Sequence, residues 1–218
     1  MTPNPPEPDV PRALRALADD DASVRLRAAL AIGTEPDPRF VVPLVERSAV
    51  EPEFFVRDML TWALTRHPVE LTLPELLREV ASERNQARGQ ALHTLSKVGD
   101  PRAWPAITEA HLHDPDDEVA RTAWRAAVAL VPEGGEPALA ARLAARLGHG
   151  GRETRRSLSR ALVDLGEAIV PVLRTAAEHP DPEVRAHALA TETLLRDPDA
   201  GFEAVIEEAK RVVALGGA

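Results

Sequence analysis

The sequence predicts an all-α fold, an α-solenoid of about six helical hairpins that follow an N-terminal half-repeat. Three observations predict it. A short Val-Arg motif recurs about every 32 residues, and a series of prolines recurs with the same period. The composition is typical of helices that pack through small and aliphatic side chains, since aromatic residues make up only 3% of the chain and Tyr is absent. Strand-rich folds draw more heavily on aromatic residues.

The chain begins with a proline-rich stretch. Residues 1–8 contain four prolines and are expected to form a flexible tail, because proline lacks the N–H that a helix interior needs. Asp9 suits the N-cap of a short helix with Pro11 in its first turn, and this helix is the half-repeat. Asp21 then precedes the next expected helix, residues 22–33.

The Val-Arg motif marks the first helix of each hairpin. Its form is Val-Arg-x-x-(Ala or Leu), and successive copies start 32, 31, 32, 35 and 30 residues apart. One hairpin cannot bury its apolar side alone, so neighbouring hairpins are expected to share a continuous core. The six copies begin at Val24-Arg25, Val56-Arg57, Ala87-Arg88, Val119-Ala120, Thr154-Arg155 and Val184-Arg185.

A series of prolines marks the second helices independently. Proline is tolerated in a first helical turn, where its missing N–H would have no helical partner in any case. A closing helix is expected over 201–215, ended by Gly216-Gly217. Because no stretch has the composition of a linker, we expect a single domain over 9–215. The prolines are Pro11, Pro43, Pro74, Pro105, Pro137 and Pro171.

These residues resemble HEAT repeats, in the short bacterial form also called PBS-lyase-like HEAT repeats. Residues 24–33, the Asp37-Pro-Arg39 corner and residues 87–107 carry the resemblance, which extends over about 9–215. It implies a right-handed, armadillo-like α-α superhelix, with first helices on the convex side and second helices on the concave side. Partners of such proteins usually lie on the concave side. The chain resembles uncharacterised bacterial members, so the resemblance implies a fold and no particular function.

Two enzyme classes with this repeat can be sought residue by residue. Deoxyhypusine hydroxylases of the family hold two irons with His-Glu dyads, but none of the seven histidines here is followed by Glu. Alkylbase DNA glycosylases use a catalytic Asp one turn after a Trp, and Trp62, Trp104 and Trp124 have no Asp three or four residues downstream. His111 and His113 are two residues apart and would point in different directions on a helix. We therefore expect no metal, no cofactor and no catalytic residue.

Three arginines occupy equivalent positions, four residues after a second-helix proline. Arg15, Arg47 and Arg78, the arginine row, would line the concave side and suit an acidic peptide through charge-assisted, bidentate hydrogen bonds. Glu75 and Glu109 are weaker candidate contacts. The alternative is a set of exposed ion pairs, each worth of order 0–1 kcal/mol. The carboxylates of that alternative belong to Glu46, Glu75, Glu79 and Glu109.

Residues 142–160, the basic segment, carry six arginines and one acidic residue, Glu153. Arg155 is expected to hold neighbouring hairpins together, as the repeat uses its position. The other arginines could contact phosphates, although no aromatic residue lies among them to stack on bases. The alternative is a solvated basic face. These candidate anion-binding residues are Arg142, Arg146, Arg152, Arg156 and Arg160.

The aromatic residues of the chain concentrate at 54–62, with Phe54, Phe55 and Trp62. We expect packing to account for most of this concentration, because Phe and Trp dominate apolar burial. The alternative is that Trp62 anchors a partner. Trp62 lies six residues into a first helix, at a varied position that we expect to be half-exposed. The equivalent residues are Leu30, His93, Arg125, Arg160 and Ala190.

Composition limits the possible functions. The chain has no Cys, which excludes disulfides, thiolate metal sites and Cys nucleophiles. Its formal charge of −9 argues against a general nucleic-acid coat, and neither a signal peptide nor a membrane-spanning run is evident. We expect a cytoplasmic, non-catalytic scaffold or adaptor that binds a protein or peptide, as a monomer or weak dimer. A DNA-directed protein that uses the basic segment is the alternative, and a small-molecule enzyme is a third possibility.

Overall fold

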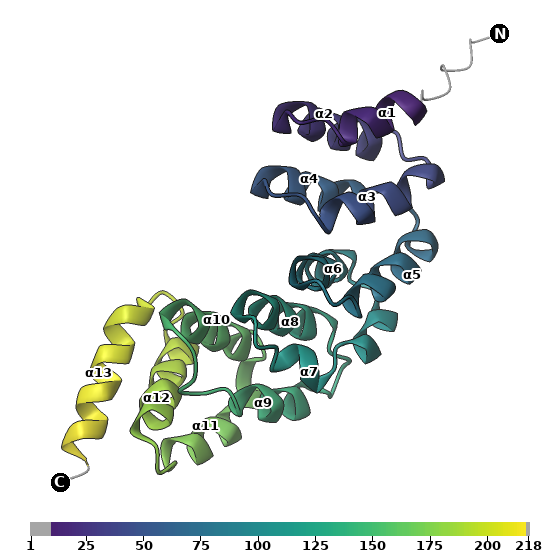
Figure 1. Ribbon diagram of the computed structural model, residues 1–218. Coiled ribbons are helices and arrows are strands. Elements are labelled where there is room, and N and C mark those ends of the chain that lie inside the picture. Colours follow the sequence, from purple (N-terminus) through teal and green to yellow (C-terminus); the bar gives the residue numbers. More distant parts are fainter. Residues whose placement is uncertain (1–9, 217–218) are drawn as a thin grey trace. The chain divides into compact units, whose positions relative to one another are not determined.

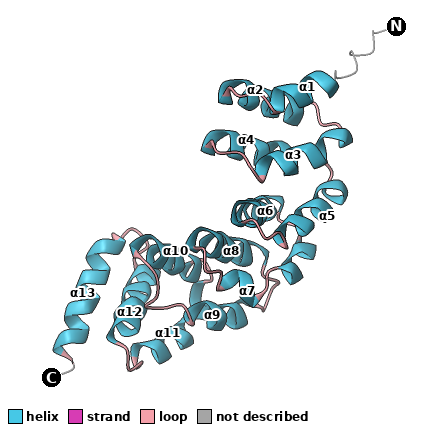
Figure 2. Ribbon diagram, viewed as in Figure 1, coloured by secondary structure: helices cyan, strands magenta, loops and turns pink. Residues whose placement is uncertain are grey.

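The computed structural model describes residues 10–216, and this part of the chain consists of helices and loops without a strand (Figure 2). The predicted tail over 1–8, the N-cap Asp9 and the final Gly217 lie outside the described residues. Within 10–216, no helix is both long enough and apolar enough to cross a bilayer. The chain divides into two compact units, an N-terminal unit that ends at Ala106 and a C-terminal unit that begins at Ile107. The single domain over 9–215 stays a prediction.

The N-terminal unit is a stack of helical hairpins (Figure 1). The half-repeat α1 packs on α2, the first helices α2, α4 and α6 pack in sequence, and the second helices α3 and α5 pack on each other. Its elements are α1 (Val10–Leu17), α2 (Ala22–Thr34), η1 (Pro38–Phe40), α3 (Val41–Ser48), α4 (Phe54–Thr65), α5 (Val69–Val80), α6 (Asn85–Val98) and η2 (Pro101–Ala106), where η marks a 3-10 helix.

The C-terminal unit repeats the same plan. The first helices α8, α10 and α12 pack in sequence, α9 packs on α11, and α13 closes the unit against α12. Its elements are α7 (Glu109–Leu112), α8 (Asp117–Leu130), α9 (Glu136–Ala144), α10 (Arg152–Val163), η3 (Gly166–Ile169), α11 (Val170–Ala177), α12 (Pro182–Arg196) and α13 (Phe202–Leu215). The predicted all-α repeat of helical hairpins is therefore confirmed, while its superhelical handedness stays a prediction.

The arginine of the Val-Arg motif closes the corner before four of the six first helices. Its Nη1 donates to two backbone carbonyls, five and six residues earlier, at 2.6–2.9 Å. Loop carbonyls have no helical partner, so this charged donor satisfies groups that would otherwise need water. At the fifth copy, Arg155 Nε donates to the Gly150 carbonyl at 3.1 Å. The arginines that make both bonds are Arg25, Arg57, Arg88 and Arg185.

Two of the six marker prolines do not lie in a first helical turn, so that part of the prediction is wrong. Pro74 is the sixth residue of α5, because this helix starts directly after Pro68 without the 3-10 turn that precedes α3 and α11. Pro74 leaves the Glu70 carbonyl without its helical donor. Pro105 lies inside η2, and the regular helix that follows it along the chain, α7, has only four residues.

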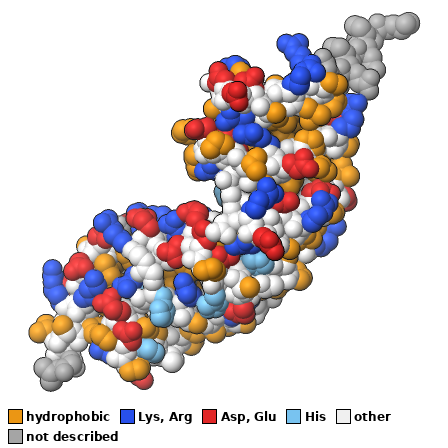
Figure 3. All heavy atoms as spheres, in the orientation of Figure 1, with side chains coloured by type: hydrophobic (Ala, Val, Ile, Leu, Met, Phe, Trp, Pro, Cys, Tyr) orange, Lys and Arg blue, Asp and Glu red, His pale blue; other side chains and the backbone are white. Residues whose placement is uncertain are grey.

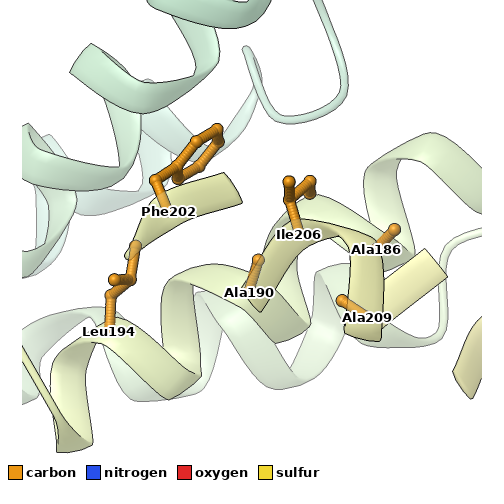
Figure 4. Close-up of a cluster of buried hydrophobic side chains, with 6 residues drawn as sticks. All are labelled: Ala186, Ala190, Leu194, Phe202, Ile206 and Ala209. Atoms are coloured by element: carbon orange, nitrogen blue, oxygen red, sulfur yellow. The ribbon is translucent and has the colours of Figure 1, made fainter. Parts of the chain in front are cut away.

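The closing helix α13 buries a face of α12 (Figure 4). From α12, Ala186, Ala190 and Leu194 contact Phe202, Ile206 and Ala209 of α13, and all six are buried. The expectation that Ala190 is half-exposed is therefore wrong, because its helix is the one that the terminal helix covers. The result is a buried apolar layer between α12 and α13.

A buried carboxylate joins two neighbouring hairpins of the N-terminal unit. The Glu51 side chain is fully buried and accepts from Arg25 Nε and Nη2, both at 2.7 Å, and from Arg47 Nε at 2.8 Å. The backbone N–H of Glu53 donates to it as well, at 3.0 Å. Burial alone would raise the pKa of Glu51, but these donors outweigh it and lower that pKa to about 2. The group is therefore charged whenever the protein is folded near neutral pH.

Replacing this carboxylate should destabilise the N-terminal unit strongly. We predict that Glu51→Gln lowers the free energy of unfolding by about 3–5 kcal/mol, because Arg25 then remains buried without its counter-charge. Urea unfolding of the full chain measures the loss. The matched control is Glu53→Gln at an exposed position, which should change the free energy by less than about 0.5 kcal/mol. Equal effects of the two substitutions would contradict the structural role of Glu51.

Candidate functional site

The most unusual surface of the N-terminal unit is the start of α4. Phe54 is 64% exposed and Phe55 74% exposed, with their rings edge to face and 5.5 Å between centroids. The expectation that packing accounts for these two side chains is therefore wrong. Equivalent residues of Phe55 in the other first helices are polar or charged, which suits their exposure. They are Ser23, Gln86, Glu118, Glu153 and Glu183.

The same helix end has no side-chain cap, which is also true of α6 and α10. In α2, α8 and α12 an aspartate N-cap accepts from the backbone N–H two residues on, at Asp21, Asp116 and Asp181. The N-cap of α4 is Glu53, and its side chain makes no capping hydrogen bond. A missing cap costs about 1 kcal/mol, and the two exposed rings bury little surface, although they pack on each other and the Arg57 guanidinium lies 6.0 Å from the Phe54 centroid. Folding stability therefore does not explain why aromatic residues occupy positions 54 and 55.

Phe55, Asp58 and Trp62 form one exposed face of α4, called the α4 face below. Residues seven apart on a helix lie within about 20° of each other and about 10 Å apart along the axis. Asp58 lies between the two aromatic side chains, and all three are exposed, Trp62 at 37%. Arg57 is held outside this face, since its Nη1 is bound by the carbonyls of Glu51 and Pro52 at 2.9 and 2.6 Å and its guanidinium lies over the Phe54 ring, 6.0 Å from the centroid. The face is therefore apolar at both ends and acidic in the middle.

Trp62 is held in place by the neighbouring first helix. A Cβ at Gly33 of α2 would overlap the Trp62 ring and would lie 2.9 Å from the Ala63 Cα. The ring therefore rests on the backbone of α2 and keeps about a third of its surface open. Leu30, at the equivalent position of α2, is 47% exposed, and α2 packs directly on α4. The sequence hypothesis of a half-exposed position is correct for both residues.

Two of the three arginines in the arginine row bind carboxylates of this chain. Arg47 is bound to the buried Glu51, with its side chain 21% exposed, so it belongs to the ion-pair cluster rather than to an open row. Arg78 pairs with Glu75 at 2.6 Å, as the ion-pair alternative expected. Arg15 is exposed. The missed signal was Glu51, four residues after Arg47, whose burial could not be read from the sequence. A partner-binding role for Arg15, Arg78 and Glu75 stays a prediction.

The basic segment is neutralised by carboxylates from other helices. Arg142 pairs with Glu109 of α7, Arg152 with Glu203 of α13 at 2.7 Å, and Arg155 with Glu183 of α12. The first pairing also places Glu109 in an ion pair. Figure 3 shows positive and negative side chains interspersed over the visible surface. The positive charge counted along residues 142–160 is therefore partly neutralised in the folded chain by carboxylates of other helices. Arg146 and Arg156 are partly buried and Arg160 is exposed.

A buried serine and histidine in the C-terminal unit have the composition of a catalytic pair. Ser159 Oγ lies 3.0 Å from His187 Nε2, and both residues are fully buried. The backbone N–H of Gly148 donates to His187 Nδ1 at 3.0 Å, so the neutral ring carries its proton on Nε2. That nitrogen then donates to Ser159 and to the Arg155 carbonyl and has no lone pair to accept the serine proton. The pair is structural.

A small hollow lies among α3, α5 and α6. It encloses about 190 Å³, open solvent included, and this is below the 300–1,000 Å³ of usual ligand pockets. Its lining is mainly apolar, with Val45, Leu76 and Ala91 beside Gln90 and Thr94. The hollow offers no support for the small-molecule enzyme considered above.

Comparisons with known proteins add likenesses of fold. No protein-family model and no curated protein sequence matches the chain. One similar solved structure is the complex of CpcE and CpcF of phycocyanin lyase from Nostoc sp. PCC7120, with 17% identity, a TM-score of 0.47, and coverage of 96% of this chain and 89% of that one. Another is human deoxyhypusine hydroxylase in complex with glycerol, with 18% identity, a TM-score of 0.47 and 94% of each chain covered. Identities this low transfer no residue roles to this chain.

Burial of His187 makes the C-terminal unit sensitive to acid. Removal of the ring from water, with the Arg155 charge nearby, lowers the pKa of His187 to about 4 from the usual 6.5, although its bond to the Arg155 carbonyl opposes this. Below pH 6.5 the unfolded chain therefore binds a proton that the folded chain does not. Stability that is complete above pH 6.5 should fall as the pH drops towards 4, by about 3 kcal/mol in total.

The prediction can be measured by urea unfolding at pH 7 and pH 5. His187 should contribute a loss of about 2 kcal/mol over this interval. We expect the pH dependence of His187→Gln to be weaker by that amount. His149→Gln, at an exposed position, should keep the full dependence. Identical pH profiles for all three chains would contradict a buried neutral imidazole.

Proposed function

We propose that this chain is a protein-binding helical-repeat module whose partner contacts the α4 face. The observation that carries the proposal is the exposure of Phe55 and Trp62 on one side of a rigid helix. Aromatic side chains dominate binding energy at protein interfaces, and an apolar surface that is not needed for folding marks such a site. The proposal places the contact on a first helix, whereas the sequence favoured the second helices.

Two further features support a binding role over the alternatives. The Ser159–His187 pair is arranged as a donor network, which removes the strongest candidate for nucleophilic chemistry. Three arginines of the basic segment bind carboxylates of the same chain, which weakens the case for a phosphate-binding surface. On the α4 face, in contrast, Phe55 is 74% exposed and has little part in folding, and Trp62 packs on Gly33 of α2 while about a third of its surface stays open.

Removal of one aromatic side chain should separate binding from folding. We predict that Phe55→Ser reduces capture of the partner from an extract of the native cell by about tenfold or more, the scale of an interface hot spot. Its urea unfolding should stay within about 0.5 kcal/mol of the wild type, because the residue is exposed. Val212→Ser is the matched control, since Val212 is 51% exposed on α13.

The arginine row provides the opposing test. If an acidic partner bound Arg15 and Arg78, the double charge reversal Arg15→Glu with Arg78→Glu would abolish capture. The α4 proposal expects capture to stay within about twofold, because exposed charges outside an interface contribute little. Loss of capture in the double variant together with full capture by Phe55→Ser would move the binding surface to the second helices.

A further inference from the structure

The α4 face carries a charge pattern that specifies its partner. Asp58 is exposed on α4, three residues after Phe55 and four before Trp62, so it lies near the middle of the apolar face. Glu53, at the N-terminal end of the same helix, is exposed as well. The nearest basic side chain of α4, Arg57, is held by two loop carbonyls. A segment docked here would bring its central residue against an uncompensated carboxylate.

Resting on the proposed function, we infer that the α4 face binds a basic amphipathic helix of the partner. The two aromatic side chains, about 10 Å apart along α4, match apolar residues at positions i and i+7 of a facing helix. A Lys or Arg at position i+3 or i+4 of that helix would then meet Asp58. Docking partly removes Asp58 from water, which is unfavourable without a counter-charge and favourable with one.

The same carboxylate argues against a second copy of this chain as the occupant. A two-fold symmetric dimer pairs each surface with itself. Because Asp58 is close to midway between Phe55 and Trp62, antiparallel pairing of two α4 faces would bring the two Asp58 side chains together at the centre. Two partly desolvated like charges would oppose that dimer. An acidic segment is disfavoured on the same ground.

The neighbouring first helix α2 also exposes an apolar side chain. This surface indicates on which side of α4 the docked segment makes further apolar contact. Leu30 of α2 is 47% exposed at the position equivalent to Trp62, and α2 packs directly on α4. Towards α6, the equivalent of Phe55 is the exposed polar residue Gln86. A helix bound on the α4 face would therefore gain apolar contact on its α2 side and meet polar residues on its α6 side.

Two synthetic helical peptides test the inference on the full chain. Both carry Leu at i and i+7, with Lys at i+4 in the basic peptide and Glu in the acidic one, and fluorescence anisotropy measures their binding. We expect the basic peptide to bind about tenfold more tightly, Asp58→Lys to reverse that order, and Phe55→Ser to weaken the basic peptide by about tenfold. Val212→Ser should leave binding of both peptides unchanged.

The possible failures are distinct. If the two peptides bind equally well and Phe55→Ser weakens both, the α4 face does not prefer a basic helix. The proposed protein-binding function would still hold. Binding of both peptides unaffected by Phe55→Ser, together with unchanged capture of the partner by that variant, would overturn both proposals. Analytical sedimentation of the chain alone tests whether a second copy of the chain occupies the α4 face. A concentration-dependent dimer that Phe55→Ser dissociates would identify a second copy and contradict the basic helix.

Discussion

The arginine that enters four of the six first helices is the interaction on which the repeat most depends. Each hairpin is followed by a short loop whose carbonyls have no helical partner, and the guanidinium of Arg25, Arg57, Arg88 or Arg185 binds two of them at once. This fixes where the next helix starts. Arg25 also binds the buried Glu51, which joins its hairpin to the following one. Side chains at equivalent positions consequently have comparable surroundings in successive first helices, except on α12, where α13 covers Ala190.

Such regularity makes departures from it informative. Where Phe55 stands, the other first helices place polar residues, and where Glu53 stands, three of them place a capping aspartate. Within the same helix, Arg57 keeps its structural bonds and Trp62 rests on Gly33. The helix is therefore anchored as firmly as its neighbours while its open side is apolar. A rigid element that presents aromatic groups loses little conformational entropy on binding.

Local patterns in the sequence predicted the fold because each hairpin carries its own signals, an arginine motif and a proline. They failed where the outcome depends on contacts between distant residues. Arg47 was assigned to an open row because the burial of Glu51 arises only when two hairpins stack. From the sequence alone, Arg142 and Arg152 are candidate anion-binding residues because their carboxylates lie 33 and 51 residues away. Phe54 and Phe55 were expected inside because aromatic residues usually are, whereas their helix position faces water.

Site-specific photo-crosslinking can show whether another protein occupies the α4 face. A photoreactive phenylalanine analogue would replace Phe55 in the full chain, and in a second chain Val212, the similarly exposed apolar residue of α13. After irradiation in the native cell, the account predicts a covalent adduct at position 55 only, joined to a partner peptide that contains Lys or Arg. Adducts at neither position, or equally at both, would contradict it.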